Sequence, residues 1–201
     1  MNYLISPLII MLAFALYGWL HSLLAASAAK EGARARFGEP LVKRGYRLFF
    51  NAVGVLTLLP VLALVFWLPD QHLYTVPPLL LPIFLGGQVL GLLVLAYSLA
   101  QTDVLDFIGL RQVGAPAMPP PLATGGVYAW VRHPLYLGSM LVLWLLPSMS
   151  ANWLALVLSS SLYFVIGARF EEGKLEKFYG KAYRDYKART PAFLPWPRKN
   201  G

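Results

Sequence analysis

Five long runs of apolar residues, separated by short polar segments, dominate the pattern of hydrophobic and polar positions along the chain. Each run is close to the roughly 20 residues that a helix needs to cross the hydrocarbon core of a bilayer. Prolines lie at the ends of several runs, where they terminate helices. The pattern predicts an all-α polytopic membrane protein with about five transmembrane helices. The expected spans are residues 3–27, 47–69, 77–100, 127–147 and 152–168.

A more polar segment, residues 170–189, follows the last run. Its apolar side chains recur at spacings of three and four residues, which is typical of one face of a helix. Most of its Lys and Arg residues lie off that face. We therefore expect an amphipathic C-terminal helix at the membrane surface, and a simple basic anchor is the alternative interpretation. The apolar positions are Leu175, Phe178, Ala182 and Tyr186.

Composition supports the membrane assignment. Of the 201 residues, 58% are hydrophobic and 13% are charged, whereas about a quarter are charged in a soluble domain. Five spans leave no room for a separate soluble domain, so we expect residues 1–201 to form a single membrane-embedded domain. Residues 1–101 would hold three spans, and residues 102–201 would hold a loop, a helical hairpin and the C-terminal helix. No Lys or Arg precedes the first run, so we interpret it as a retained span rather than a signal peptide.

The distribution of positive charge predicts an orientation. All 17 Lys and Arg residues lie in three regions that five spans would place on one side: the first interhelical loop, residues 101–132 and the region from Arg169 onward. Because Lys and Arg are enriched in cytoplasmic loops, we expect the N-terminus outside and the C-terminus in the cytoplasm. The net charge of +8 is clustered beside apolar runs, which indicates an anionic bilayer surface rather than nucleic acid as the partner.

Metal and cysteine chemistry is not indicated. The chain has no cysteine, and its three histidines are far apart in the sequence. The sequence therefore offers no disulfide, no thiolate ligand and no spacing typical of a metal site.

One stretch is a candidate site because it places polar chemistry at the start of an apolar run. Arg132 and His133 directly precede Pro134. Ionisable residues near a membrane span are costly unless they meet a partner, water or a ligand. Pro134 lacks a backbone donor, and irregular backbone in a membrane is tolerated where protein buries it or a cavity lines it.

Two motifs in the second half of the chain carry a family resemblance. The first is Gly126-x-Tyr128-x4-His133-Pro134-x-Tyr136-x-Gly138, and the second is Glu171-Glu172-x2-Leu175-x4-Gly180-x2-Tyr183-x2-Tyr186. In this order, around a helical hairpin, they resemble the isoprenylcysteine carboxyl methyltransferase superfamily of integral membrane enzymes. The resemblance implies S-adenosyl-L-methionine as cofactor and methyl transfer as the reaction.

The resemblance also implies which residues line the cofactor pocket. The family uses the loop before the first motif, the tyrosine of Gly-x-Tyr, the His-Pro-x-Tyr run and the first glutamate of the pair. We assign Arg169 and Glu172 to the catalytic, acceptor-facing part of the site. The cofactor residues implied in this way are Leu122, Ala123, Tyr128, His133, Pro134, Leu135, Tyr136 and Glu171.

Two further stretches carry a second resemblance. The stretch from Asp106 to Gln112, in the middle of the chain, is similar to the Phe-Gly-Leu-Arg-Gln loop of the bacterial methanethiol S-methyltransferase branch, and the segment around His21 is similar to the N-terminal half of that branch. We assign Gln112 to the cofactor and His21, Asp106 and Arg111 to the acceptor, where they could deprotonate or steer a nucleophile. For a thiol acceptor, the thiolate is the reactive form.

One position departs from the superfamily. The carboxyl methyltransferases carry a substrate-facing arginine four residues before the first glutamate of the pair. This chain has Gly167 there, and the nearest arginine is Arg169. The departure favours a small or lipophilic acceptor, with a thiol as the expected one, over a prenylcysteine carboxylate.

Three alternatives remain open at this point. An isoprenylcysteine carboxyl O-methyltransferase would share both motifs. A non-catalytic membrane accessory protein could bind the cofactor without turnover. A sterol-reductase-like enzyme that uses NADPH has a related architecture, but the signature of that class includes a cysteine, and this chain has none.

Overall fold

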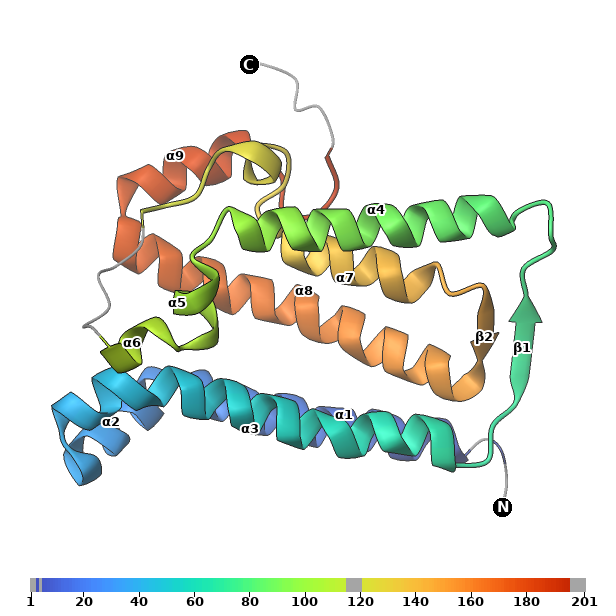
Figure 1. Cartoon of the computed structure of the whole chain (residues 1–201), viewed down its shortest axis with the longest axis horizontal. Helices are drawn as coiled ribbons and strands as arrows, with labels where there is room; N and C mark the ends of the chain where they lie inside the picture. The colour runs from blue at the N-terminus through green and yellow to red at the C-terminus, as the bar shows by residue number, and fades with distance from the viewer. Residues whose placement is uncertain (1–2, 4, 115–120, 196–201) are drawn as a thin grey trace. The chain divides into compact units, whose positions relative to one another are not determined.

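The computed structural model describes residue 3 and residues 5–114 and 121–195, and this part of the chain is almost entirely helical (Figure 1). Four helices are long and apolar enough to cross a membrane, which confirms the expectation of an all-α polytopic membrane protein. They are α1 (Ile5–Ala25), α3 (Glu39–Trp67), α4 (Leu81–Ala100) and α8 (Ala151–Tyr179). The shorter helices are α2 (Ser27–Phe37), α5 (Val104–Ile108), α6 (Arg111–Gly114), the 3₁₀ helix η1 (Gly126–Ala129), α7 (Pro134–Trp144) and α9 (Lys181–Arg189).

The expected span over residues 127–147 is shorter than its apolar run. Only Pro134–Trp144 is α-helical, which is 11 residues or roughly 16 Å at 1.5 Å per residue. His133 has a non-helical backbone, with φ −121° and ψ 62°, because a residue before proline is disfavoured in the α region. At the other end the chain turns after Leu145 into the short strand β2 (Ser148–Ser150), which pairs with β1 (His72–Thr75).

The expected C-terminal helix over residues 170–189 is also corrected. Residues 170–179 continue α8 without a break, and α9 begins only at Lys181. Gly180 separates the two helices with a φ of +57°, a conformation that glycine adopts without the steric cost of a side chain. The apolar stripe is split accordingly, because Tyr186 is buried in α9 while Phe178 of α8 is exposed.

The chain divides into two compact units, and each is described by itself. The first unit contains Met1–His72, Asp103–Pro119 and Ser150–Ser159, and the second contains Leu73–Thr102, Pro120–Met149 and Ser160–Gly201. The single membrane-embedded domain, with its division at residues 101 and 102, stays a prediction.

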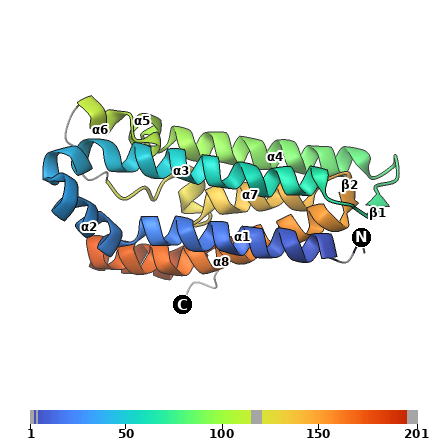
Figure 2. The same cartoon turned by 90° about the horizontal axis from the view of Figure 1, so that it is seen from below.

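In the first unit, α1 and α3 run alongside each other (Figures 1 and 2). The buried residues of α1 recur every four positions at Ser6, Ile10, Phe14 and Gly18, as one face of a helix requires. The first turn of α8 closes the end of α3, because the buried Asn152 amide donates to the carbonyls of Val65 and Leu68 at 3.3 Å each. These carbonyls belong to the last turn of α3, where a helix leaves them without a partner of its own.

In the second unit, α4 packs closely against α7 (Figure 2). A Cβ on Gly91 would lie 2.9 Å from the Gly138 carbonyl oxygen, and a Cβ on Gly138 would lie 2.8 Å from that of Gly91. The Gln88 amide donates across the same contact to the Val142 carbonyl at 3.1 Å. Small residues allow membrane helices to approach in this way, so Gly138 of the first motif is required for packing.

Candidate active site

The Arg132-His133-Pro134 turn is held by the segment that follows α9. The Arg132 N–H donates to the Pro191 carbonyl at 2.8 Å, and the His133 N–H donates to the Ala192 carbonyl at 3.0 Å. Pro134 is the first residue of α7 and has no N–H to satisfy. The backbone N–H groups of Arg132 and His133 are therefore hydrogen-bonded within the protein, although they lie outside a regular helix.

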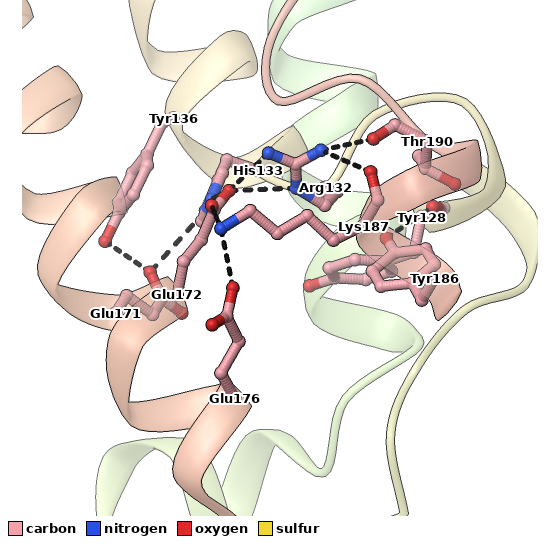
Figure 3. Close-up of polar contacts among 10 residues, drawn as sticks. All are labelled: Tyr128, Arg132, His133, Tyr136, Glu171, Glu172, Glu176, Tyr186, Lys187 and Thr190. Atoms are coloured by element: carbon pink, nitrogen blue, oxygen red, sulfur yellow. Dashed lines mark hydrogen bonds and ion pairs between the residues drawn. The ribbon is translucent and has the colours of Figure 1, made fainter. Parts of the chain in front are cut away.

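Glu172 is the centre of a buried ion network in the second unit (Figure 3). One of its oxygens, Oε1, accepts from Arg132 Nη2 at 2.6 Å and from Arg132 Nε at 2.8 Å. The same oxygen lies 3.1 Å from His133 Nε2, and Oε2 lies 3.0 Å from Lys187 Nζ. The Arg132 and Glu172 side chains are only 7% and 11% exposed. The network thus joins the turn before α7 to α8 and α9, and the Arg132 and Glu172 charges in it have little access to water.

Lys187 extends this network along α8. Its ammonium group also lies 2.6 Å from Glu176 Oε1. Hydrogen bonds to Glu176 and Glu172 raise the pKa of Lys187 above its ordinary value, because both carboxylates stabilise the charged form. Lys187 therefore remains a cation and neutralises the second oxygen of Glu172.

Glu171 precedes Glu172 but has different neighbours. Tyr136 donates its hydroxyl to Glu171 Oε2 at 2.9 Å, and His133 Nδ1 lies 3.6 Å from the same oxygen (Figure 3). The Glu171 side chain is 46% exposed. A carboxylate can accept about four hydrogen bonds, so Glu171 retains acceptor capacity for a ligand.

Four aromatic rings form a column beside Glu171. Tyr136 stacks on Phe164 at 5.2 Å between ring centroids and on His133 at 5.3 Å, with 10° between the planes in both pairs. The Phe193 ring also contacts His133, with 5.6 Å between the ring centroids and 31° between the planes. Offset stacking at such distances is favourable for aromatic rings, and it fixes the orientation of the His133 and Tyr136 side chains.

Tyr128 borders the same region from η1. Its carbonyl accepts a hydrogen bond from the Tyr186 hydroxyl at 2.6 Å, which ties η1 to α9. Burial and the nearby negative charge of Glu171 raise the pKa of the Tyr128 phenol, since both disfavour the phenolate. Tyr128 is therefore a neutral hydroxyl near the Glu171 carboxylate.

The loop before η1 is fixed by Gln101 of the second unit. The Val127 N–H donates to Gln101 Oε1 at 3.2 Å, and Gln101 Nε2 donates to the Gly125 carbonyl at 3.3 Å. Gly126 lies between them with a φ of +56°, and a Cβ there would lie 1.9 Å from Gln101 Nε2. The first glycine of the motif is thus required by backbone conformation and by space. Leu122 and Ala123 are half-buried in the loop before it.

Asp106, Arg111 and Gln112 lie in the first unit and form a polar cluster of their own. Gln112 is buried and donates to Asp106 Oδ1 at 2.6 Å, and Arg47 forms an ion pair with Asp106 Oδ2. Arg111 pairs instead with Asp103 at 2.5 Å. Both Asp106 oxygens therefore have donors from the protein itself.

His21 lies in α1 and packs among aromatic rings. Its ring centroid is 4.6 Å from that of Phe50 and 5.7 Å from that of Tyr17. Gly54 makes room for it, because a Cβ there would lie 3.3 Å from His21 Cδ2. This environment is that of a packed side chain in the first unit, and the acceptor role of His21 stays a prediction.

The structure brings His133, Tyr136, Glu171 and Glu172 together, with Tyr128 beside them. Arg169, which we assigned to the acceptor, is exposed, and its guanidinium group has no carboxylate within ion-pair distance in the described ranges 5–114 and 121–195. Sequence reasoning missed Lys187, Phe193 and Gln101. The sequence did indicate Arg132, because it is a charged residue next to an apolar run. No feature of the sequence distinguishes Lys187 from an ordinary surface lysine.

Comparison with known proteins places this geometry in a family. The phospholipid methyltransferase family matches residues 83–182. Methanethiol S-methyltransferase 1 of Bradyrhizobium diazoefficiens is 30% identical over 202 residues, which cover 96% of this chain and 68% of the relative. Methanethiol S-methyltransferase of Pseudomonas deceptionensis is 28% identical over 212 residues, which cover 98% of this chain and 75% of the relative.

A further relative is similar over a shorter stretch of the chain. Protein-S-isoprenylcysteine O-methyltransferase of Mus musculus is 37% identical over 83 residues, which cover 37% of this chain and 28% of the relative. No solved structure matches the chain.

The helical fold, the paired glutamates and these similarities define an integral membrane methyltransferase, and the chain belongs to the isoprenylcysteine carboxyl methyltransferase superfamily. Within it, the chain falls in the branch of the bacterial methanethiol S-methyltransferases. Both parts of the resemblance found in the sequence are thereby confirmed.

Proposed function

We propose that the chain transfers a methyl group from S-adenosyl-L-methionine to a thiol. The observation that carries the proposal is the half-exposed Glu171 carboxylate, held by Tyr136 beside the aromatic column. The relatives named methanethiol S-methyltransferase support a thiol as the acceptor.

The residues of the second unit fit the chemical groups of this cofactor. Glu171 can accept hydrogen bonds from ribose hydroxyls or an ammonium group, and the aromatic column offers a face for a purine ring or a cation. Leu135 and Tyr136 lie in the first turn of α7, where backbone N–H groups have no intrahelical partner and suit a carboxylate. When bound, the cofactor would supply a methyl group activated by a positively charged sulfur. Leu122, Ala123, Tyr128 and Pro134 complete the proposed pocket.

The protein's own contribution would be alignment and exclusion of water. Methyl transfer to a thiolate needs no proton at the reacting carbon, and holding two reactants in line removes much of the entropic barrier. Glu172 is saturated by Arg132, His133 and Lys187, so its contacts favour a positioning role over direct catalysis. Asp106 is similarly occupied by Arg47 and Gln112. The thiol proton would therefore pass to solvent.

The acceptor would enter beside Gly167. Among the described residues, and apart from the backbone of its own helix and its chain neighbours, a Cβ at this position would meet one atom within 4 Å, the Tyr136 hydroxyl oxygen at 3.9 Å. The carboxyl methyltransferases carry an arginine here, and this chain has neither its charge nor its volume. The space and the missing cation favour a small, uncharged thiol over a prenylcysteine carboxylate. Arg169, two residues further on, is the basic group of this unit that would draw in a thiolate.

The orientation is part of the proposal. The basic loops favour a cytoplasmic site with the N-terminus outside and the C-terminus in the cytoplasm, on the side where cells hold S-adenosyl-L-methionine. An anionic bilayer surface would contact the basic segments.

Calorimetric titration of the detergent-purified protein tests the proposal. We expect S-adenosyl-L-methionine and its demethylated product to bind, NADPH not to bind, and radiolabelled methyl groups to appear on methanethiol.

Glu171→Gln should weaken cofactor binding, whereas Asp185→Asn, at an exposed carboxylate paired with Lys181, serves as the matched control. Absence of binding by either methyl-cycle compound would leave the accessory-protein alternative, and methylation of a prenylcysteine in place of thiols would support the O-methyltransferase alternative.

A further inference from the structure

The segment after α9 contacts the His133 turn through its backbone. We call residues 190–193 the C-terminal strap. Its carbonyls at Pro191 and Ala192 accept the N–H groups of Arg132 and His133, and the Thr190 carbonyl accepts Arg132 Nη1. Thr190 is buried. Three successive carbonyls of the strap are therefore directed at two residues of the turn.

Arg132 joins the strap to Glu172. Its Nε and Nη2 donate to the Glu172 carboxylate, and its Nη1 donates to the carbonyls of Lys187, at 3.2 Å, and Thr190 (Figure 3). A guanidinium group has five donors in a rigid plane, whereas an ammonium group is a compact point charge. Only an arginine can therefore hold the carboxylate and the two carbonyls in this fixed relation.

His133 depends on the same groups. Its Nε2 shares Glu172 Oε1 with Arg132, its backbone N–H is held by the strap, and the Phe193 ring of the strap lies against its imidazole. The His133 ring also stacks on Tyr136, whose hydroxyl donates to Glu171. A displacement of the Arg132 side chain would therefore displace the strap and the His133 imidazole. It would also displace the Tyr136 ring, whose hydroxyl donates to Glu171.

We propose that Arg132 is a positioning residue, which docks the C-terminal strap and thereby sets the orientation of His133 for cofactor binding. The inference rests on the proposed function, because it assigns the support of that same site. Phe193 would form one wall of the cofactor pocket, and Arg132 itself, almost fully buried, would not touch the cofactor.

Arg132→Lys is the decisive variant, with Arg184→Lys as the matched control. Arg184 is an exposed residue of α9, so the control makes the same chemical change outside the network. For Arg132→Lys we expect the Kd and KM for S-adenosyl-L-methionine to rise about tenfold or more, as small displacements of a binding site do. We expect kcat at saturating cofactor to change much less, and the control to match the wild type.

A second measurement, which needs no cofactor, reports whether the C-terminal strap stays in its docked position. Trypsin can cut after Arg189 only when the buried Thr190 leaves its site. We expect faster cleavage at this bond in Arg132→Lys than in Arg184→Lys, measured by mass spectrometry of the digest. Equal cleavage rates and an unchanged cofactor Kd in Arg132→Lys would overturn the inference.

A paired substitution separates positioning from stability. Arg132→Met removes the buried partner of Glu172, whereas Arg132→Met with Glu172→Met removes both buried charges, which commonly restores stability. We expect the double variant to regain thermal stability while its cofactor affinity stays low. Recovery of affinity together with stability would overturn the positioning role. If the wild type itself binds no S-adenosyl-L-methionine, the proposed function is wrong. If the wild type binds it and Arg132→Lys binds it equally well, the positioning role of Arg132 is wrong.

Discussion

At the scale of single residues, two adjacent acids have opposite surroundings. Glu171 is 46% exposed and has one hydroxyl donor, whereas Glu172 is 11% exposed and is surrounded by Arg132, Lys187 and His133. Removing a charge from each should therefore have different effects, even though the two side chains are chemically alike.

Glu171→Gln should raise the cofactor Kd about tenfold, because a hydrogen bond to a charged group contributes roughly 1.5–3 kcal/mol, and it should leave the free energy of unfolding nearly unchanged. Glu172→Gln should lower the free energy of unfolding by about 3 kcal/mol, because it leaves the buried Arg132 guanidinium without its counter-ion. Calorimetry and denaturant titration in detergent measure the two quantities. Equal destabilisation by both substitutions would contradict the assignment.

Gly167 tests the size of the acceptor space. Gly167→Val should lower kcat/KM for a small thiol about tenfold or more, within the range that one methylene group commonly contributes to discrimination, while cofactor affinity is retained. Gly173→Val is the control on the same helix. No atom of the described residues outside its own helix backbone and chain neighbours lies within 4 Å of its Cβ position. Unaltered thiol kinetics in Gly167→Val would place the acceptor elsewhere.

At the scale of elements, apolar patterning predicted the helices better than their ends. The runs around α1, α3, α4 and α8 are helical, since burial of apolar surface in lipid requires a helix to satisfy the backbone. Continuation of α8 through the polar residues 170–179 has no hydropathy signal, because buried ion pairs there replace apolar contacts. The end of α7 likewise depends on local backbone geometry at Pro134 and after Leu145.

The close contact of α4 with α7 gives a prediction for two glycines of one helix. Gly91→Ala should destabilise the protein by about 1–3 kcal/mol, because overpacking forces the backbones apart. Gly86→Ala should be neutral or stabilising. No atom of the described part of the chain, apart from its own helix backbone and chain neighbours, lies within 4 Å of its Cβ position, and alanine is more favourable than glycine within a helix by up to about 1 kcal/mol. Thermal denaturation of both variants in detergent distinguishes them, and equal melting temperatures would contradict the packing role.

At the scale of the whole molecule, the sequence motifs predicted which residues meet at the candidate site, and the described contacts of His133, Tyr136 and Glu171 agree with that grouping. The motifs did not predict Lys187 or Phe193, because each joins the site through contacts about 15 or more positions away along the chain. Such partners depend on how helices pack, which a pattern of neighbouring residues does not encode.

The orientation across the membrane can be measured directly, because the chain has no cysteine of its own and an introduced thiol gives no background. In intact bacterial cells, Gln71→Cys should react with a membrane-impermeant maleimide, and Glu31→Cys should react only after lysis. Both side chains are exposed, so they are matched in access. The reverse labelling pattern would contradict the proposed cytoplasmic site.

The neighbouring positions of Glu171 and Glu172 also matter for evolution and engineering. Successive residues of an α-helix are rotated by about 100°, so one residue faces the proposed ligand while the next faces the buried network. Selection can therefore change what the enzyme recognises at one position without disturbing the support provided by the other. A designer who wishes to alter cofactor preference would vary Glu171 and its aromatic neighbours, and would leave Glu172 and Arg132 intact.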